Sequence, residues 1–221
     1  IDKLPFASDT NATDVGNVTV ARYGLTGQSS STHGYSSGGD INNAGGNSNI
    51  IDKHSFAVDS NATDVGDLTI TKRASAGHSS VTHGYNAGSR PTNNTIDKWP
   101  FASDTNATDV GDLTLSRTYP AGQSSTTHGY SSGGNSGSYN DRIDKFTFAT
   151  DADATDVGNL TVAKHVCGGN SSVTHGYTTS GSRSGIPYTD VIEKFTFATD
   201  ADATDVGDLT VAKNAVAGTQ K

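Results

Sequence analysis

Acidic side chains recur in a sequence that could bind a hard cation. Residues 59–66 read Asp-Ser-Asn-Ala-Thr-Asp-Val-Gly, and Asp67 follows. Oxygen-bearing side chains at positions 1, 3, 5 and 9 of such a segment suit calcium. The candidate calcium ligands are Asp9, Asp59, Asp67, Asp104, Asp112, Asp151, Asp153, Asp200, Asp202 and Asp208. The favoured interpretation is a structural turn, because Asp and Asn side chains also bond their own backbone without a metal.

Histidine recurs in the tripeptide His-Gly-Tyr. These histidines are His33, His83, His128 and His175. A ring of them could bind a metal, but equivalent repeats place the ring nitrogens too far apart for one ion. We interpret each imidazole as bonded to a hydroxyl or to a turn carboxylate of its own or an adjacent unit, which accounts for Ser and Thr neighbours such as Ser30 and Thr32. A Ser/His/Asp hydrolase needs one asymmetric constellation, whereas here every repeat carries the same residues, so we expect no enzyme.

The whole chain is an internal repeat, and a period of this size determines the fold. Units open with Ile-Asp-Lys or Ile-Glu-Lys at residues 1, 51, 96, 143 and 192, so the period is 45–50 residues. The length varies only between the Tyr of His-Gly-Tyr and the next Ile. We expect one repeat domain over residues 1–221 whose last unit is truncated. Without an initiator Met, the sequence is expected to be a processed product or a piece of a longer chain.

Each unit is predicted to contain four short strands. In one unit these are residues 33–37, residues 51–57, residues 67–71 and the Ser/Thr-rich stretch that ends at residue 82. The segment 59–66 is predicted to be a turn of fixed length, since its Asp, Asn and Gly residues favour turns. Scarce helix formers and abundant Gly, Ser, Thr, Asn and Asp favour an all-β fold.

The Gly-Tyr strand followed by Gly-Gly, in residues 34–39 and 129–134, resembles the kelch repeat of β-propellers. The resemblance implies an all-β propeller of about five four-stranded antiparallel blades, with His-Gly-Tyr on the innermost strand. The family's Trp after the turn is missing, and the Gly pair is broken at residues 88–89 and 180–181. Unit one lacks a preceding inner strand and unit five stops before one, so an open ring or a ring of six or seven blades is the alternative.

Two further resemblances bear on function. The Asp-Leu pairs at residues 67–68, 112–113 and 208–209 are similar to the ends of calcium loops in integrin-type (FG-GAP) propeller blades, although Gly stands at the eighth position here. The tandem blocks Ile-Asp-Lys-Phe, Asn-Ala-Thr-Asp-Val-Gly-Asp-Leu-Thr and Thr-His-Gly-Tyr resemble repeats in virion-associated proteins of marine tailed phages. This second resemblance implies a structural role in a virion.

Composition excludes some classes of function. The chain carries 23 Asp and Glu against 15 Lys and Arg, a formal net charge of −8, which disfavours nucleic-acid binding. No stretch of about 20 apolar residues exists to span a membrane. Cys167 is the single cysteine, so it cannot form an internal disulfide. The equivalent residues in other units differ widely, which predicts a neutral surface or half-buried position rather than a reactive thiol.

Residues that differ between units are the candidates for partner binding. They lie in the loops that follow His-Gly-Tyr. The candidates are Asn42, Asn43, Arg90, Asn94, Tyr139, Arg142, Arg183 and Tyr188. If the ring closes, these loops emerge on one face, and a surface of Tyr, Arg and Asn suits glycan or protein contacts. Drift in unconstrained loops is the alternative.

These observations favour a non-enzymatic structural or binding protein. We expect a phage virion appendage or decoration protein that contacts a host surface, with other virion or surface proteins, and also glycans, as candidate partners. The alternative is a secreted calcium-dependent adhesin or lectin-like propeller, with calcium as its cofactor. The expected location is a virion or the extracellular space.

Overall fold

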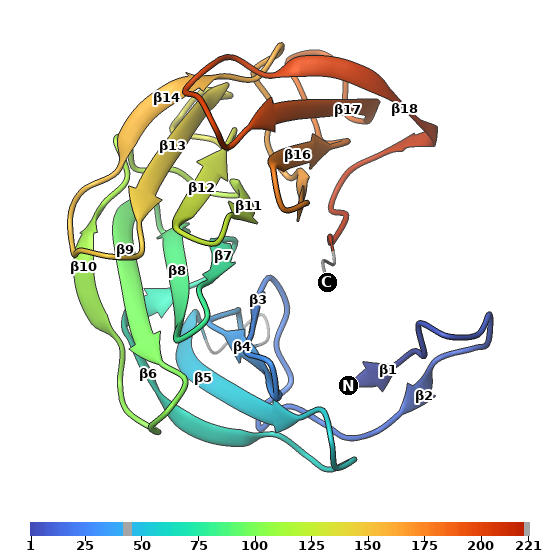
Figure 1. Ribbon diagram of the computed structural model, residues 1–221, viewed down its shortest axis with the longest axis vertical. Helices are drawn as coiled ribbons and strands as arrows, with labels where there is room; N and C mark the ends of the chain where they lie inside the picture. Colours follow the sequence, from blue (N-terminus) through green and yellow to red (C-terminus); the bar gives the residue numbers. More distant parts are fainter. Residues whose placement is uncertain (42–45, 219–221) are drawn as a thin grey trace.

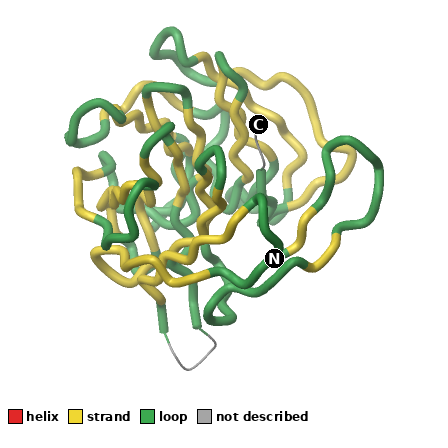
Figure 2. Tube along the Cα trace, turned by 60° about the horizontal axis from the view of Figure 1, so that its bottom comes forward, coloured by secondary structure: helices red, strands yellow, loops and turns green. Residues whose placement is uncertain are grey.

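The structure is a computed structural model that describes residues 1–41 and 46–218, and these ranges contain strands, turns and loops (Figure 2). Four four-stranded sheets and one two-stranded sheet contain all the named strands. Neighbouring strands pair antiparallel throughout, as β8 does with β9. The predicted all-β class and the four-stranded repeats are confirmed. Within the described ranges, no helix is long and apolar enough to cross a membrane.

Each four-stranded sheet is formed by consecutive strands. Sheet 1 consists of β3 (Thr26–Ser29), β4 (His33–Ser37), β5 (Ser48–Ser55) and β6 (Thr63–Lys72). Sheet 2 consists of β7 (Ala76–Ser79), β8 (His83–Ser89), β9 (Asn93–Pro100) and β10 (Thr108–Asp112). Sheet 3 consists of β11 (Ala121–Ser124), β12 (His128–Ser132), β13 (Arg142–Thr147) and β14 (Thr155–Asn159). Sheet 4 consists of β15 (Gly168–Ser171), β16 (His175–Thr179), β17 (Thr189–Thr196) and β18 (Thr204–Lys213).

The N-terminal hairpin, residues 1–17, pairs β1 (Asp2–Lys3) with β2 (Thr13–Asp14). The hairpin and the four sheets follow one another around an arc, with β3, β7 and β11 on its inner side and β6, β10, β14 and β18 on its outer side (Figure 1). In the described residues the arc stays open between β17–β18 and the hairpin. The N-terminus lies at this opening, so the arrangement is blade-like without being a closed ring.

The order of strands in a sheet differs from the prediction. We expected His-Gly-Tyr on the innermost strand and the Ser/Thr-rich stretch as the last strand of each unit. In the structure the Ser/Thr-rich strand is innermost and His-Gly-Tyr is second, as β7 and β8 show. The physical reason is that β7 and β8 are joined by residues 80–82, and so short a loop has a low entropic cost of closure. Each sheet therefore starts and ends one strand earlier than predicted, as sheet 1 does by starting at Thr26 and not at His33.

The predicted turn at residues 59–66 is also shorter than expected, because β6 begins at Thr63. Asp64 already pairs with Asp52 of β5, and the register shifts between Ile50 and Asp52. The same irregularity recurs in sheet 2, where Gly111 has φ +147° and a Cβ there would lie 2.5 Å from the Ala152 carbonyl oxygen. Only Gly permits this approach of one sheet to the next.

Apolar side chains are buried between neighbouring sheets rather than in one central core. Tyr35, Ile51 and Leu68 of sheet 1 pack with Trp99 and Ala107 of sheet 2. Equivalent clusters join sheet 2 to sheet 3 and sheet 3 to sheet 4. Full burial of one such side chain contributes roughly 1.5–3 kcal/mol. Each sheet therefore depends on its neighbour for stability, as in other repeat architectures.

Candidate functional site

Charged residues that recur in every unit join neighbouring sheets in the interior. Lys72 Nζ of sheet 1 lies 3.1 Å from Asp97 Oδ2 of sheet 2, and both side chains are 0% exposed. Thr69 Oγ1 donates to the other Asp97 oxygen at 2.5 Å. Burial lowers the pKa of Lys72, and Asp97 opposes that shift. The equivalent ion pairs are Arg22–Asp52, Arg117–Asp144 and Lys164–Glu193. These charges are inaccessible to a ligand and serve the framework.

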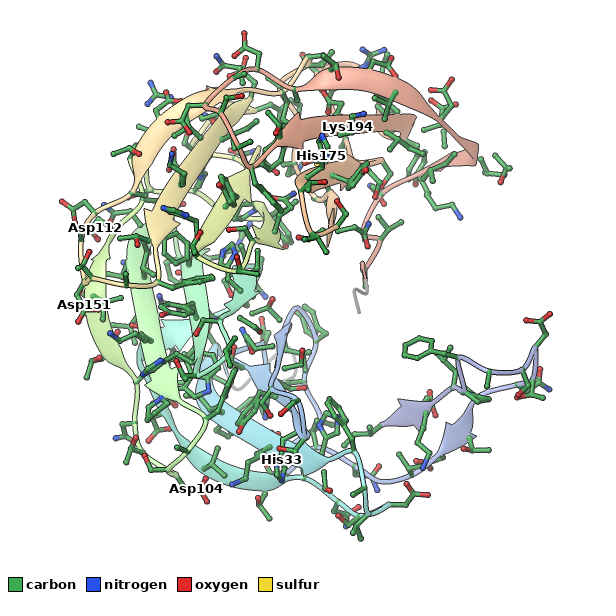
Figure 3. All side chains as sticks on the ribbon, viewed as in Figure 1. His33, Asp104, Asp112, Asp151, His175 and Lys194 are labelled. Atoms are coloured by element: carbon green, nitrogen blue, oxygen red, sulfur yellow. The ribbon has the colours of Figure 1, made fainter. Side chains whose placement is uncertain are left out.

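The first aspartate of every acidic turn except the one in residues 9–16 forms an exposed ion pair with the preceding sheet. Lys53 Nζ of sheet 1 lies 2.5 Å from Asp104 Oδ1 of sheet 2. The equivalent pairs are Lys3–Asp59, Lys98–Asp151 and Lys145–Asp200. Asp104 and Asp151 lie at the outer rim of the arc (Figure 3). Four of the five candidate calcium ligands at this position therefore contact a lysine of the neighbouring sheet, and Asp9 is the exception within the described residues.

The third position of the turn accepts a backbone hydrogen bond from the preceding sheet. Asp153 Oδ1 accepts from the Asp112 N–H at 3.0 Å, and Asp202 Oδ1 accepts from the Asn159 N–H at 2.8 Å. Asn106 has the same role toward the Asp67 N–H, at 3.0 Å. The acidic turn thus holds one sheet to the next, as expected of a structural turn.

The acidic side chains do not gather around one point. Across residues 1–41 and 46–218, no three His, Cys, Asp or Glu side chains are grouped so that they could hold a metal ion. Asp9 and Asp208 are exposed on the hairpin and on β18. Burial and the charges of Asp109 and Asp153 raise the pKa of Asp112. Calcium binding by these turns stays a prediction.

The recurring histidines bond a neighbouring hydroxyl, which is one of the two kinds of partner that the sequence predicted. His33 Nδ1 lies 2.9 Å from Thr32 Oγ1. The same contact occurs at His83, His128 and His175, each at 2.8 Å. Burial and the nearby Lys98 charge lower the pKa of His83. His33 and His175 lie in separate sheets (Figure 3). The repeated histidines are framework residues.

Cys167 is half-buried, in agreement with the prediction. Burial raises the pKa of its thiol to about 12. The thiolate is the reactive form of cysteine, so this side chain is protected from reaction at neutral pH.

The loops that differ between units meet at one face and line two adjoining grooves. The first groove, of about 620 Å³, is lined by Asn47, Arg73, Arg90, Pro91, Thr92, Thr118, Tyr119, Asn135, Gly137 and His165. The second, of about 730 Å³, is lined by Asn135, Gly137, Ser138, Tyr139, Val162, Ala163, Arg183, Ser184 and Ile186. The grooves share Asn135 and Gly137. Sheets 1 to 4 all contribute, so this is the composite surface that the sequence predicted from its loops.

The two grooves, which we call the loop-face grooves, combine aromatic rings with positive charge. His165 stacks on Tyr139, with ring centroids 4.6 Å apart, and meets Tyr119 edge-on at 6.0 Å. Arg90 is exposed and Arg183 is half-buried. None of the residues that line either groove is acidic. In a chain with a net charge of −8, the linings of these grooves therefore carry arginines and no carboxylate.

Three of the predicted partner-binding residues, Arg90, Tyr139 and Arg183, line these grooves. The other described candidates are absent from the groove linings. Asn94 Nδ2 donates to the Leu113 carbonyl at 3.5 Å. Arg142 lies 3.5 Å from Asp156, and Tyr188 is 54% exposed. Asn42 and Asn43 lie outside the described residues.

Sequence reasoning missed part of the surface. Arg73, Tyr119 and His165 lie in the short connections between one sheet and the next, which were not considered for binding. A signal was present, because the residues equivalent to Arg73 in the other units are Tyr23, Thr118, His165 and Asn214. Residue type changes at this position in every unit, as in the longer loops. Arg73 also forms an ion pair with Asp40, which fixes its guanidinium at the rim.

No protein-family model matches the chain. The curated proteins likewise contain no match to it.

Proposed function

We propose that the chain is a non-enzymatic structural and binding module, built as a β-propeller of about five blades, whose partner contacts the loop-face grooves. One observation carries this proposal. Residues that recur in every unit are engaged in contacts between sheets, such as Lys72–Asp97 and Lys53–Asp104. The grooves, in contrast, are lined mostly by residues from loops and connections that differ between units. Variation on a fixed framework is the arrangement expected of a recognition surface.

The chemistry of the grooves favours an acidic glycan as ligand. Guanidinium groups bind carboxylates through paired, charge-assisted hydrogen bonds, and Arg90 and Arg183 supply two of them. The stacked pair of His165 and Tyr139 offers a flat apolar face against which the C–H face of a sugar ring can pack. Asn47 and Asn135 supply amide donors and acceptors for hydroxyl groups. We therefore propose an oligosaccharide that carries a sialic or uronic acid.

We further propose that this module belongs to a phage virion, as an appendage or decoration protein that contacts a host surface through these grooves. The support is the resemblance of the tandem blocks to repeats in virion-associated proteins. The alternative is a secreted calcium-dependent adhesin or lectin, supported by the acidic turns. The two proposals differ in whether calcium is required. In the adhesin, calcium would bind the acidic turns that hold the sheets together and not the grooves, whose linings contain no carboxylate.

Binding can be tested by calorimetry with oligosaccharides that differ only in whether the acid is a carboxylate or its reduced alcohol. We expect Arg90→Ala and Arg183→Ala each to weaken binding of the carboxylate about tenfold or more, since a charged hydrogen bond contributes roughly 1.5–3 kcal/mol. Arg142→Ala removes the same charge outside the grooves and should leave affinity unchanged. Equal affinity for acid and alcohol would refute the ligand class.

Location can be tested on the source material by sedimentation together with intact mass spectrometry. A virion role requires that the polypeptide sediment with a particle of megadalton size. A free particle of the chain's own mass, 22.7 kDa, would refute the virion proposal and leave the adhesin alternative.

A further inference from the structure

The three interfaces between complete sheets use the same contacts in the same register. Tyr130 of sheet 3, for example, stacks on Phe197 of sheet 4 with centroids 4.7 Å apart. Lys145 of sheet 3 lies 2.5 Å from Asp200 of sheet 4. Inside, Lys164 of sheet 3 lies 2.5 Å from Glu193 of sheet 4. An interface therefore needs a Tyr and two cations on one side, and a Phe and two carboxylates on the other.

Sheet 4 presents the first half of this set at the opening of the arc. The residues that correspond to Tyr130, Lys145 and Lys164 are Tyr177, Lys194 and Lys213. Within the described residues, neither Lys194 nor Lys213 has an ion-pair partner. Lys194 lies on β17, the strand beside the opening (Figure 3).

Apolar groups of sheet 4 are also uncovered at this edge. Val206 is 46% exposed, whereas its equivalent Val65 is 8% exposed. A Cβ on Gly207 would meet nothing within 4 Å, whereas on the equivalent Gly158 it would lie 2.5 Å from the Ala201 carbonyl oxygen of the next sheet. The edge of sheet 4 is therefore shaped for a neighbour that the open arc does not place there.

The N-terminal hairpin presents the second half of the set. Phe6 corresponds to Phe197, Asp9 to Asp200 and Asp2 to Glu193. Phe6 is 88% exposed, and Leu4, on the same hairpin, is 59% exposed. Exposed Leu and Phe together with unmatched carboxylates form the complement of the edge of sheet 4. The other side of the hairpin already contacts sheet 1 in the regular way, through Lys3 and Asp59.

We propose that residues 1–17 dock on β17 and β18 of the same chain and so close the arc into a ring. The contacts formed are Lys194 with Asp9, Lys213 with Asp2, and Tyr177 with Phe6. The hairpin and β17–β18 face the same opening (Figure 1), so tethering gives the hairpin a high effective concentration there. A hairpin from a second copy would have to bring the sheets of that copy into the same opening, so docking within one chain is favoured. This inference rests on the ring architecture of the proposed function and not on its ligand.

Zero-length cross-linking tests the inference on the unmodified protein. A water-soluble carbodiimide joins a lysine amine to a carboxylate that it contacts, and peptide mass spectrometry identifies the joined residues. Lys53–Asp104 and Lys145–Asp200 are matched controls, because both are exposed pairs at 2.5 Å in complete interfaces. We expect a Lys194–Asp9 link in yield comparable to these controls. A mixture of nitrogen-15-labelled and unlabelled protein shows whether the two joined residues come from one chain.

A variant supplies a second measurement that does not depend on the cross-linker. Phe6→Asp changes a side chain that is 88% exposed in the open arc, so the four sheets should fold in either case. If the hairpin docks, this variant loses the Lys194–Asp9 link, keeps the Lys145–Asp200 link and lowers the melting temperature. Formation of the control links without Lys194–Asp9 overturns the proposal. Links that join labelled to unlabelled chains also overturn it, because they place the hairpin on a second copy. Glycan binding is measured separately, so its failure is distinguishable from failure of closure.

Discussion

Replacing Asp97 by Asn should strongly destabilise the protein through the ion pair that joins sheets 1 and 2. The change keeps the shape of the side chain but removes the negative charge that lies 3.1 Å from Lys72 Nζ. Lys72 would lie at 0% exposure without a counter-ion, with only the Thr95 and Asn86 carbonyls, at 3.1 and 3.4 Å, to accept from it. Removal of one partner of a buried ion pair costs about 3–5 kcal/mol.

Equilibrium unfolding in urea measures this loss. Because the free energy of unfolding falls by about 1–3 kcal/mol per molar urea, and more for larger proteins, the midpoint should fall by roughly 1–2 M. Lys98→Gln is the matched control on the same strand. It breaks the ion pair with Asp151, whose side chain is 59% exposed, and exposed pairs contribute only about 0–1 kcal/mol.

A third variant separates the loss of the ion pair from the cost of leaving one buried charge without a partner. Lys72→Met together with Asp97→Leu removes both charges, and such apolar replacements are often neutral or stabilising. We expect this double variant to be more stable than Asp97→Asn alone. If Asp97→Asn lowers the midpoint no more than Lys98→Gln does, the buried pairs do not hold neighbouring sheets together and the reasoning is wrong.

Three further predictions follow from single side chains and from the acidic turns. Burial lowers the pKa of His78 to about 4 from 6.5, so the unfolded state binds a proton first as pH falls from 6.5 to 4. The free energy of unfolding should therefore decline over that window by about 3 kcal/mol. The variant His78→Gln introduces the residue found at the equivalent positions Gln28 and Gln123, and it should remove this decline when urea midpoints are measured against pH. Cys167 should resist iodoacetamide at pH 8 in the folded protein and react in urea, and rapid labelling of the folded form would contradict its burial. EDTA should leave the melting temperature unchanged, since lysines and backbone N–H groups already contact the turn oxygens; a clear decrease, reversed by calcium, would instead favour the calcium-dependent adhesin.

The repeat made much of the framework predictable from the sequence. Its period and its turn residues predicted four-stranded units, and the resemblance to kelch repeats implied antiparallel strands; the structure confirms both. The boundary between sheets was wrong because a period does not reveal where one sheet ends. Local pairing decides that boundary, and residues 76–79 pair forward with β8 rather than backward with β6. The partner of Asp97 was equally hidden, since Lys72 belongs to the preceding unit.

The loop-face grooves were only partly predictable. Arg90, Tyr139 and Arg183 were found because their loops vary in length and composition between units. The stacking of Tyr139 on His165 was not found, since it joins a loop within sheet 3 to the connection between sheets 3 and 4. Sequence spacing carries no information on which of these segments bend toward each other over the face of the arc.

The buried contacts between sheets also make the units interchangeable. A lysine or arginine at or just after the outermost strand of one sheet pairs with a carboxylate on the third strand of the next sheet, so every interface between sheets uses the same chemistry. Deletion of residues 52–96 would place Asp97 at the position of Asp52, which now pairs with Arg22. Asp97 would then form the equivalent ion pair with Arg22, and the contact between sheets would be restored. Recombination between repeats could therefore lengthen, shorten or shuffle the chain without disturbing its interior. The face that carries Arg90 and Tyr139 would change with each such event, which gives this architecture a direct route to new binding specificities.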